Sequence, residues 1–419
     1  MGDVTAAAAR PKPWIAALVV ATAMQTVLAM LTRALPVIGP PITALAGVPD
    51  ENVGHLAALC SFGTMVFLLG GAPLIAVFGP VRLLQCGALL GGGAILLGLS
   101  GSWAALLLAS FAIGVGYAPS APAGSEVLQQ RVPARRRSLM FSIKQSGVPL
   151  GGVIAGAMLP PLLLWGGVPA AIVGAAVLTF LAVLAAEPLR HAIDADRPLP
   201  PEAAAGALAP RLAAQLTMPF RIVLADPGRI VITFAGVSFA VAQGALFTFF
   251  VTALHVGTDH SLAAIGAAFA LMQAVGVVSR VAVGWIADRI GSAHRTLVGL
   301  AFASSATMAV LAFAEADWPY VAISAVAAVS GFAVASWNGV LLAEVSALAP
   351  RGRVGEATAA TTFFIFAGYV IGPLVISTIV AATGSYTAGF LFAAAPPFVS
   401  GLLLLAIRHR APPTPRAGA

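Results

Sequence analysis

Long apolar stretches recur along the whole chain and are separated by short polar segments. A helix of roughly 20 residues crosses a hydrocarbon layer of about 30 Å, and each stretch is close to that length. The pattern therefore predicts membrane-spanning helices from one end of the chain to the other. The first six are predicted over residues 14–35, 53–78, 82–100, 103–128, 139–164 and 169–186, and the second six over residues 230–254, 261–286, 296–314, 319–343, 357–381 and 386–407.

One long polar stretch, residues 187–229, separates the two sets of six spans. Its prolines and mixed charge predict a cytoplasmic linker, and its alanine-rich part, residues 202–216, is compatible with a surface helix. The expected organisation, in chain order, is an N-terminal cytoplasmic tail at residues 1–13, a six-helix half at residues 14–186, the linker, a six-helix half at residues 230–407 and a C-terminal cytoplasmic tail at residues 408–419.

The two sets of spans share landmarks, which indicates a duplicated six-helix unit. The glycine and proline pairs at matching offsets are Gly114 with Gly331, Pro133 with Pro350, Gly71 with Gly284 and Gly79 with Gly291.

Basic residues gather on one side of the predicted spans. With the N-terminus in the cytoplasm, of the 22 Lys and Arg only Arg33, Lys144 and Arg280 lie inside spans, and the others fall in cytoplasmic segments. Because basic segments resist translocation, both termini are predicted to be cytoplasmic. The scattered charges build no continuous patch for nucleic acid. With 59% hydrophobic residues and a mean hydropathy of +0.97, the chain is expected to be a multi-pass plasma-membrane protein, in the inner membrane of a bacterium.

Motifs for other chemistries are missing from the sequence. It contains no Gly-Lys-Ser/Thr phosphate loop and no His-Glu-x-x-His zinc pair, so we expect no ATP hydrolysis, no metal and no cofactor. Cys60 and Cys86 fall inside predicted spans and are expected to be packing residues. No acid, base and nucleophile gather in the spans, which argues against an enzyme.

The segment after the eighth span reads Gly284-Trp285-Ile286-Ala287-Asp288-Arg289-Ile290-Gly291. It resembles the G-x-x-x-D-R-x-G signature of the major facilitator superfamily, at the position of that family's second copy. Glycine permits close helix approach, and Asp288 can pair at a helix end where Arg289 faces the cytoplasm. The resemblance implies that Gly284, Asp288, Arg289 and Gly291 help to hold one conformational state closed.

The first copy of this signature is incomplete. Gly79 and Arg82 are kept, but Ala76 and Val77 stand where the family has Asp-Arg. We therefore expect the latch of the first half to be weaker or differently built, and assign the gating role to the second copy alone.

The resemblance covers about residues 14–407. It implies an all-α integral membrane protein with twelve transmembrane helices in two pseudo-symmetric six-helix bundles, and a secondary transporter that works by alternating access as a monomer. A small-molecule substrate, the lipid bilayer and a coupling proton are the expected partners.

Two cations inside the spans point to the substrate. Lys144 lies roughly 10 Å above the cytoplasmic end of the fifth span, and Arg280 lies roughly 12 Å above that of the eighth. The fifth and eighth helices are neighbours in this superfamily, so the resemblance brings the two cations together.

An anion between them would remove their repulsion, and a guanidinium can bind a carboxylate with two parallel hydrogen bonds. The position of Arg280 also resembles that of the substrate-binding arginine in oxalate and monocarboxylate transporters. We therefore predict a small organic anion, a mono- or dicarboxylate, as cargo.

Several alternatives remain for the polar residues of the spans. Glu126 reaches nearly the depth of Lys144, so it is either the carrier of the coupling proton or an ion-pair partner of Lys144; lactose permease has an acidic and a basic residue in similar places, where they bind sugar. A polar neutral substrate would suit the same residues.

Arg33, near the outer end of the first span, either extends its side chain to the membrane interface or lies on the access path of an anion. Six further residues are candidates for the cavity wall or for interhelical hydrogen bonds: Gln25, Gln145, Gln243, Gln273, Trp337 and Asn338.

Two rival functions use the same fold. The protein could export amphipathic or drug-like compounds through a large apolar cavity, although internal cations would repel cationic drugs. A non-transporting membrane sensor would be expected to carry a signalling domain, for which the tails and the linker offer no room.

Overall fold

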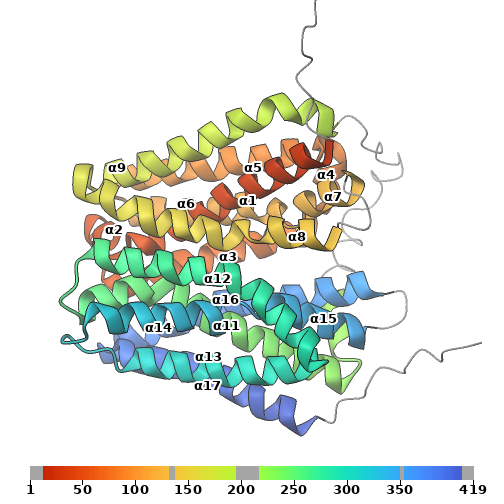
Figure 1. Cartoon of the computed structure of the whole chain (residues 1–419). Coiled ribbons are helices and arrows are strands. Elements are labelled where there is room, and N and C mark those ends of the chain that lie inside the picture. Colours follow the sequence, from red (N-terminus) through yellow and green to blue (C-terminus); the bar gives the residue numbers. More distant parts are fainter. Residues whose placement is uncertain (1–12, 132–136, 195–216, 350–352, 408–419) are drawn as a thin grey trace, which may run out of the picture.

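The computed structural model describes residues 13–131, 137–194, 217–349 and 353–407, and these form helices joined by short turns. Within this described part of the chain, eleven helices are long and apolar enough to cross a membrane. The longest, α9 (Gly147–Asp194), contains a break at Gly166 and Gly167, where Gly167 has a φ of 68°. Figure 1 shows α9 turning back on itself at this point, so it crosses twice. The described residues thus agree with the predicted twelve crossings of an all-α membrane protein.

The first half of the chain contains several short helices as well as α9. In chain order its α-helices are α1 (Pro13–Val37), α2 (Gly39–Leu45), α3 (Val53–Gly70), α4 (Ala72–Phe78), α5 (Pro80–Ile95), α6 (Trp103–Tyr117), α7 (Pro122–Arg131), α8 (Arg137–Gln145) and α9. The second half contains α11 (Pro227–Gly257), α12 (Leu262–Ile290), α13 (Ala293–Ala312), α14 (Tyr320–Ala333), α15 (Asn338–Leu348), α16 (Val354–Thr383) and α17 (Tyr386–Ala406).

Several predicted spans are broken helices. The fourth span is α6 and α7 joined by a 3₁₀ turn, the fifth is α8 followed by the start of α9, and the tenth is α14 followed by α15. Pro122 opens α7, and Gly147 opens α9 directly after the turn at Ser146. Proline lacks the N–H that would continue a helix, and glycine weakens one, so the breaks have local causes. The sixth span ends later than predicted, because α9 continues to Asp194, and the alanine-rich piece at residues 202–216 lies outside the described residues.

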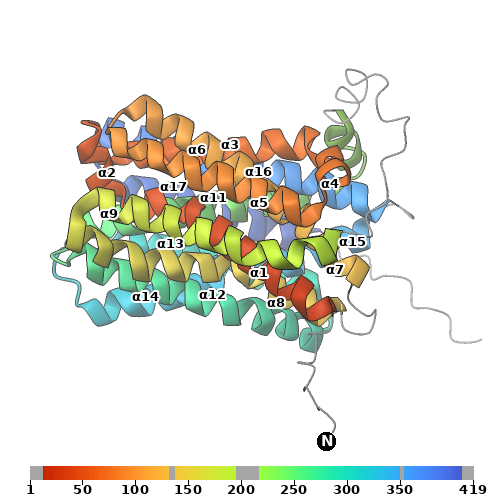
Figure 2. The same cartoon turned by 90° about the horizontal axis from the view of Figure 1, so that it is seen from above.

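The two halves lie side by side. In Figure 1 the red to yellow-green helices of the first half lie above the green to blue helices of the second. They meet where α9 packs on α12, α3 on α16 and α1 on α11. The expected contact between the fifth and eighth spans is therefore present. Figures 1 and 2 show α2 at the opposite end of the bundle from α4, α7, α8 and α15; we call the α2 end outer and the other end, where the charge distribution places the cytoplasm, inner.

Apolar packing joins the halves at the outer end. One continuous cluster of buried side chains includes Leu31 and Val53 of the first half together with Phe249 and Phe269 of the second. Towards the inner end each half has a cluster of its own, one around Leu84 and the other around Leu297. The structure is therefore closed on the outer side and parted on the inner side.

Close backbone contacts support the outer closure. A Cβ atom on Gly156 of α9 would stand 2.7 Å from the carbonyl oxygen of Gly266 on α12, so only glycine allows this crossing. On the other interface Ser377 Oγ of α16 donates a hydrogen bond of 2.6 Å to the carbonyl of Glu51.

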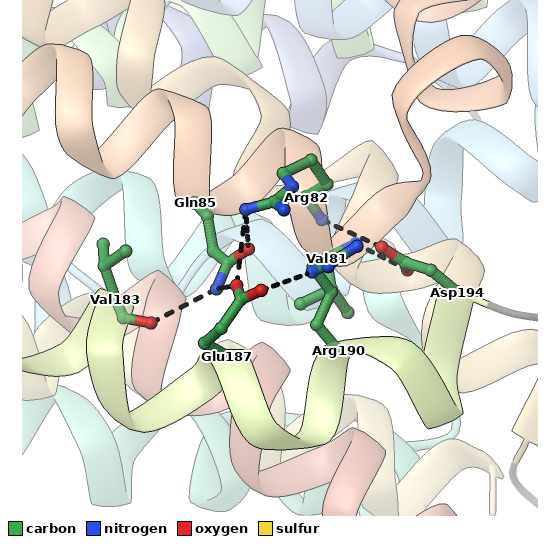
Figure 3. A network of polar contacts seen from close by, with 7 residues as sticks. All are labelled: Val81, Arg82, Gln85, Val183, Glu187, Arg190 and Asp194. Atoms are coloured by element: carbon green, nitrogen blue, oxygen red, sulfur yellow. Dashed lines mark hydrogen bonds and ion pairs between the residues drawn. The ribbon is translucent and has the colours of Figure 1, made fainter.

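A polar network at the inner end ties α5 to the end of α9 (Figure 3). The Asp194 carboxylate accepts hydrogen bonds from the main-chain N–H groups of Val81 and Arg82, at 3.0 and 3.1 Å, in the first turn of α5. Glu187 accepts from Gln85 Nε2 at 2.9 Å and pairs with Arg82 at 3.3 Å.

This network stands where the first half lacks the Asp-Arg pair of the family signature. A carboxylate at the first turn of a helix satisfies N–H groups that have no intrahelical partner and complements the helix dipole. Acids of the sixth span therefore secure this end of the first half.

Loss of this cap should loosen the inner end of the first half. We expect Asp194→Ala to lower the free energy of unfolding by about 1–2 kcal/mol, because two N–H groups lose their acceptor. Thermal unfolding in detergent would measure the change. Ser102→Ala is the matched control, because Ser102 precedes α6 without a side-chain cap; an equal loss of stability in both variants would contradict the assignment.

The closed outer side and parted inner side can be tested by labelling. In a background of Cys60→Ala and Cys86→Ala, Ser125→Cys on α7 should react with a membrane-impermeant maleimide from the cytoplasmic side, because Ser125 borders the space between the halves. Thr252→Cys is the control: Thr252 is fully buried beside Gly39 in the outer closure and should stay unlabelled. Protection of Ser125→Cys from the cytoplasmic side, together with labelling of Thr252→Cys by the same reagent added on the outer side, would show that the resting protein opens outward.

Candidate functional site

A cavity of about 1060 Å³ lies between the halves towards the inner end. Its wall is built from both halves, with α3, α7 and α8 on one side and α12, α15 and α16 on the other. A volume of this size suits a small-molecule ligand.

The wall of the cavity carries charge at one interface and is largely apolar at the other. Where the fifth and eighth spans meet, it presents Lys144, Gln145 and Arg280, and Asp288 lies further along α12. Where α3 meets α16, it presents Met65, Leu68, Leu69 and Phe363, together with Thr358 and Thr362. A bound molecule would therefore meet charged groups on one side and mainly hydrocarbon on the other.

Lys144 is held inside the first half. Its side chain is 1% exposed, and Nζ donates a hydrogen bond of 3.4 Å to the carbonyl of Ala121, at the break between α6 and α7. Gly124 makes room for it, since a Cβ atom there would stand 2.7 Å from Lys144 Cε.

Arg280 connects the two halves. Its Nε donates to the carbonyl of Ala335 at 3.2 Å, and an Nη atom donates to the carbonyl of Gln145 at 3.3 Å. Gln145 ends α8, and Ala335 lies between α14 and α15, so both carbonyls belong to helix breaks where no intrahelical donor is available. A cation is favoured at such C-terminal helix ends. Arg280 therefore donates to a main-chain carbonyl at two helix breaks, one in each half.

The cavity collects only part of the predicted set. Lys144, Gln145, Arg280 and Asn338 line it, and so do Gly284 and Asp288 of the signature segment. Gln25 lies behind this wall, where its Nε2 donates to Gln145 Oε1 at 3.1 Å.

Gln243 and Trp337 belong to the packing of the second half rather than to the cavity wall. Gln243 Oε1 accepts from Trp337 Nε1 at 3.1 Å and from the Tyr369 hydroxyl at 2.6 Å, and Trp337 stacks on Phe239 with 5.4 Å between ring centroids. Gln243 and Trp337 thus form the interhelical hydrogen bonds that were one of the two alternatives for them.

Gln273 is buried where α12 faces α9, beside Gly152. Neither atom of its amide has a hydrogen-bond partner among the described residues. It too lies away from the cavity wall.

The remaining predicted residues lie at the inner end. Glu126 is on α7 and outside the lining of the cavity, so its role as proton carrier or ion-pair partner stays a prediction. Arg289 lies over the ring of Trp285, 5.3 Å from its centroid. Gly291 ends α12 with a φ of 68°, a conformation that favours glycine. The gating role of this segment also stays a prediction.

Arg33 differs from the expectation that it snorkels to the membrane interface. Its guanidinium lies over the ring of Phe247, 4.6 Å from the centroid, and Phe247 belongs to the other half. Sequence reasoning also missed Tyr117 and Tyr369, which both lie within electrostatic range of Arg33 and of Arg280. The chain has only four tyrosines, and their rarity within apolar spans is the signal that could have singled them out.

Comparisons with solved structures agree on the fold. A mutant of the peptide transporter POT has a TM-score of 0.74 at 18% identity, covering 95% of this chain and 94% of that one. A mutant of the nucleoside transporter NupG has a TM-score of 0.73 at 14% identity, covering 93% and 99%. A POT family transporter in complex with 5-aminolevulinic acid has a TM-score of 0.70 at 13% identity, covering 96% of each chain. At these identities the likeness shows the fold alone.

Sequence comparison gives the family. Two curated relatives, uncharacterised MFS-type transporters from two strains of Mycobacterium tuberculosis, are 26% identical over 279 residues, which is 65% of this chain and 58% of theirs. The chain thus matches little more than half the length of these relatives. The model of the Major Facilitator Superfamily matches residues 14–373. The chain is therefore a multi-pass membrane protein that belongs to the Major Facilitator Superfamily.

Proposed function

We propose that this transporter moves a small organic anion, a carboxylate, across the bacterial inner membrane by alternating access. The observation that carries the proposal is the placement of Lys144 and Arg280 on the wall of one cavity between the halves. Both are held by main-chain carbonyl oxygens, and neither forms an ion pair with a carboxylate of the described residues.

Electrostatics favours an anion at this place. A cation within a membrane span costs at least about 2.5 kcal/mol, and two cations on one wall repel each other. A carboxylate offsets both effects, and its charge-assisted hydrogen bonds are stronger than those to a neutral carbonyl. The guanidinium of Arg280 has five N–H donors, and its hydrogen bonds to the two carbonyls use two of them. It can therefore bind a carboxylate and keep its contacts to both halves.

The contacts of Arg280 suggest how binding is linked to rocking. Arg280 belongs to α12 of the second half but donates to Gln145 of the first, next to Lys144. An anion held by Lys144 and Arg280 together would draw the inner ends of the halves towards one another. Release of the anion would let them part again, and the outer closure would open when the inner ends meet.

A proton is the proposed coupling ion, with Glu126 as its carrier. Glu126 is an acid on α7, near the inner end of the fourth span. This helix begins directly after Ala121, whose carbonyl accepts the hydrogen bond of Lys144. A carboxyl group that exchanges a proton there would change the charge beside the site.

The apolar wall formed by α3 and α16 supports a second candidate, an exporter of amphipathic or drug-like compounds. Met65, Leu68, Leu69 and Phe363 give this wall a hydrocarbon surface, and the cavity exceeds the needs of the smallest carboxylates. A thermal-shift screen with carboxylates and lipophilic cations separates the two candidates, because stabilisation by the cations alone would favour the exporter.

Removal of either cation should abolish tight anion binding. In proteoliposomes, Arg280→Ala and Lys144→Ala should each weaken the apparent affinity for a labelled carboxylate by roughly 10- to 100-fold, the effect of losing a charged hydrogen bond. Arg353→Ala is the control, because Arg353 is an exposed cation that pairs with Glu356 outside the cavity. Unchanged transport in both cavity variants would overturn the anion proposal.

Coupling through Glu126 can be tested with an imposed pH gradient. Glu126→Gln keeps the size of the side chain but cannot exchange a proton, so we expect it to exchange the carboxylate across the membrane while failing to accumulate it against its gradient. Accumulation equal to that of the parent protein would exclude Glu126 as the carrier.

A further inference from the structure

Arg33 is a buried cation that the carboxylate site described above does not use. It belongs to α1 of the first half, and its guanidinium lies over the ring of Phe247 on α11 of the second half, 4.6 Å from the centroid. A charged side chain at this depth of a membrane protein usually faces a partner or a substrate path. The face of an aromatic ring attracts a cation but carries no charge that would neutralise it.

No acid of the described residues lies within electrostatic range of Arg33. Its one direct contact of this kind is with the ring of Phe247, and the phenol groups of Tyr117 and Tyr369 and the thiol of Cys60 lie within electrostatic range. Arg280 lies within range of the same two phenols and of Arg33, whose like charge opposes its own. Two guanidinium groups, one from each half, therefore lie near one pair of tyrosines.

These four groups are not sealed off by their neighbours. Arg33, Tyr117, Tyr369 and Arg280 are all partly exposed, although they stand on four helices in the middle of the bundle. The hydroxyl of Tyr369 is held by the buried Gln243, to which it donates a hydrogen bond of 2.6 Å. Guanidinium and hydroxyl groups of both halves are thus partly exposed inside the bundle, and Arg280 connects them to the cavity that it lines.

We propose that Arg33, assisted by Tyr117, binds a second carboxylate, so that the cargo is a dicarboxylate whose first carboxylate is held by Arg280 and Lys144. The inference rests on the proposed function and names its substrate class. A molecule with two carboxylates neutralises both guanidinium groups and bridges the halves from α1 to α12. The ring of Phe247 then serves as the resting partner of Arg33 in the absence of cargo.

A matched pair of ligands isolates the second carboxylate. Succinate and butyrate have the same four-carbon chain and differ in one carboxylate. Their affinities for the purified transporter in detergent can be measured by titration calorimetry. We expect the parent protein to bind succinate more tightly, and Arg33→Gln to weaken succinate binding by roughly 10- to 100-fold while leaving butyrate within about twofold.

Other variants separate charge recognition from a purely structural role of Arg33. Tyr117→Phe removes one hydroxyl group and should weaken succinate severalfold without affecting butyrate; it also keeps the test valid should Arg33→Gln fail to fold. Phe247→Leu removes the ring beneath Arg33 but keeps the charge, so it should retain the preference for succinate.

Each contrary outcome has a defined meaning. An unchanged ratio of the two affinities in Arg33→Gln and Tyr117→Phe overturns the second carboxylate site, and so does an equal loss for both ligands. Equal affinity of the parent protein for succinate and butyrate overturns the dicarboxylate but leaves the proposed anion transport intact. If the parent protein binds neither ligand, the carboxylate proposal and this inference both fail.

Discussion

A carbonyl oxygen that lacks an intrahelical donor inside a membrane must find one elsewhere, because no lipid chain can supply it. Three spans of this protein are broken near the centre of the bundle, and two of the breaks leave such an oxygen, one at Gln145 and one at Ala335. The guanidinium of Arg280 donates to both oxygens. The ammonium group of Lys144 donates to the carbonyl of Ala121, which also accepts from the main-chain N–H of Ser125. Arg280, one of the two cations that mark the cavity, is thus also the group that satisfies the broken helices beside it, so site and architecture depend on the same hydrogen bonds.

The sequence predicted the spans and the main cations well, for reasons that are physical. Length and hydropathy decide whether a segment crosses a bilayer, and the resemblance to the superfamily placed the fifth and eighth spans together. Lys144, Gln145, Arg280 and Asn338 consequently meet on one cavity wall. The rotation of a helix is harder to predict, because positions that face lipid and positions that face protein are both apolar. The sequence therefore left Arg33 either at the membrane interface or on the access path of an anion, and the structure places its guanidinium over Phe247, away from the interface alternative.

Polar residues within spans posed a different difficulty. Gln243, Gln273 and Asn338 look alike in a sequence, yet only Asn338 lines the cavity. Gln243 has donors in Trp337 and Tyr369, which come from segments far away in the chain, so no local pattern could reveal the pairing. The network of Asp194 and Glu187 was missed for the same reason: its acids were assigned to a linker, whereas α9 carries them back to α5.

Gly124 and Lys144 occupy neighbouring space, so the identity of one residue affects the other. The end of the lysine side chain lies where a Cβ atom at position 124 would stand. A larger residue at position 124 would therefore displace the ammonium group without removing its charge. The absence of one methyl group on α7 thus sets where the charge of Lys144 lies, and a change at position 124 could alter cargo preference while the lysine itself is kept.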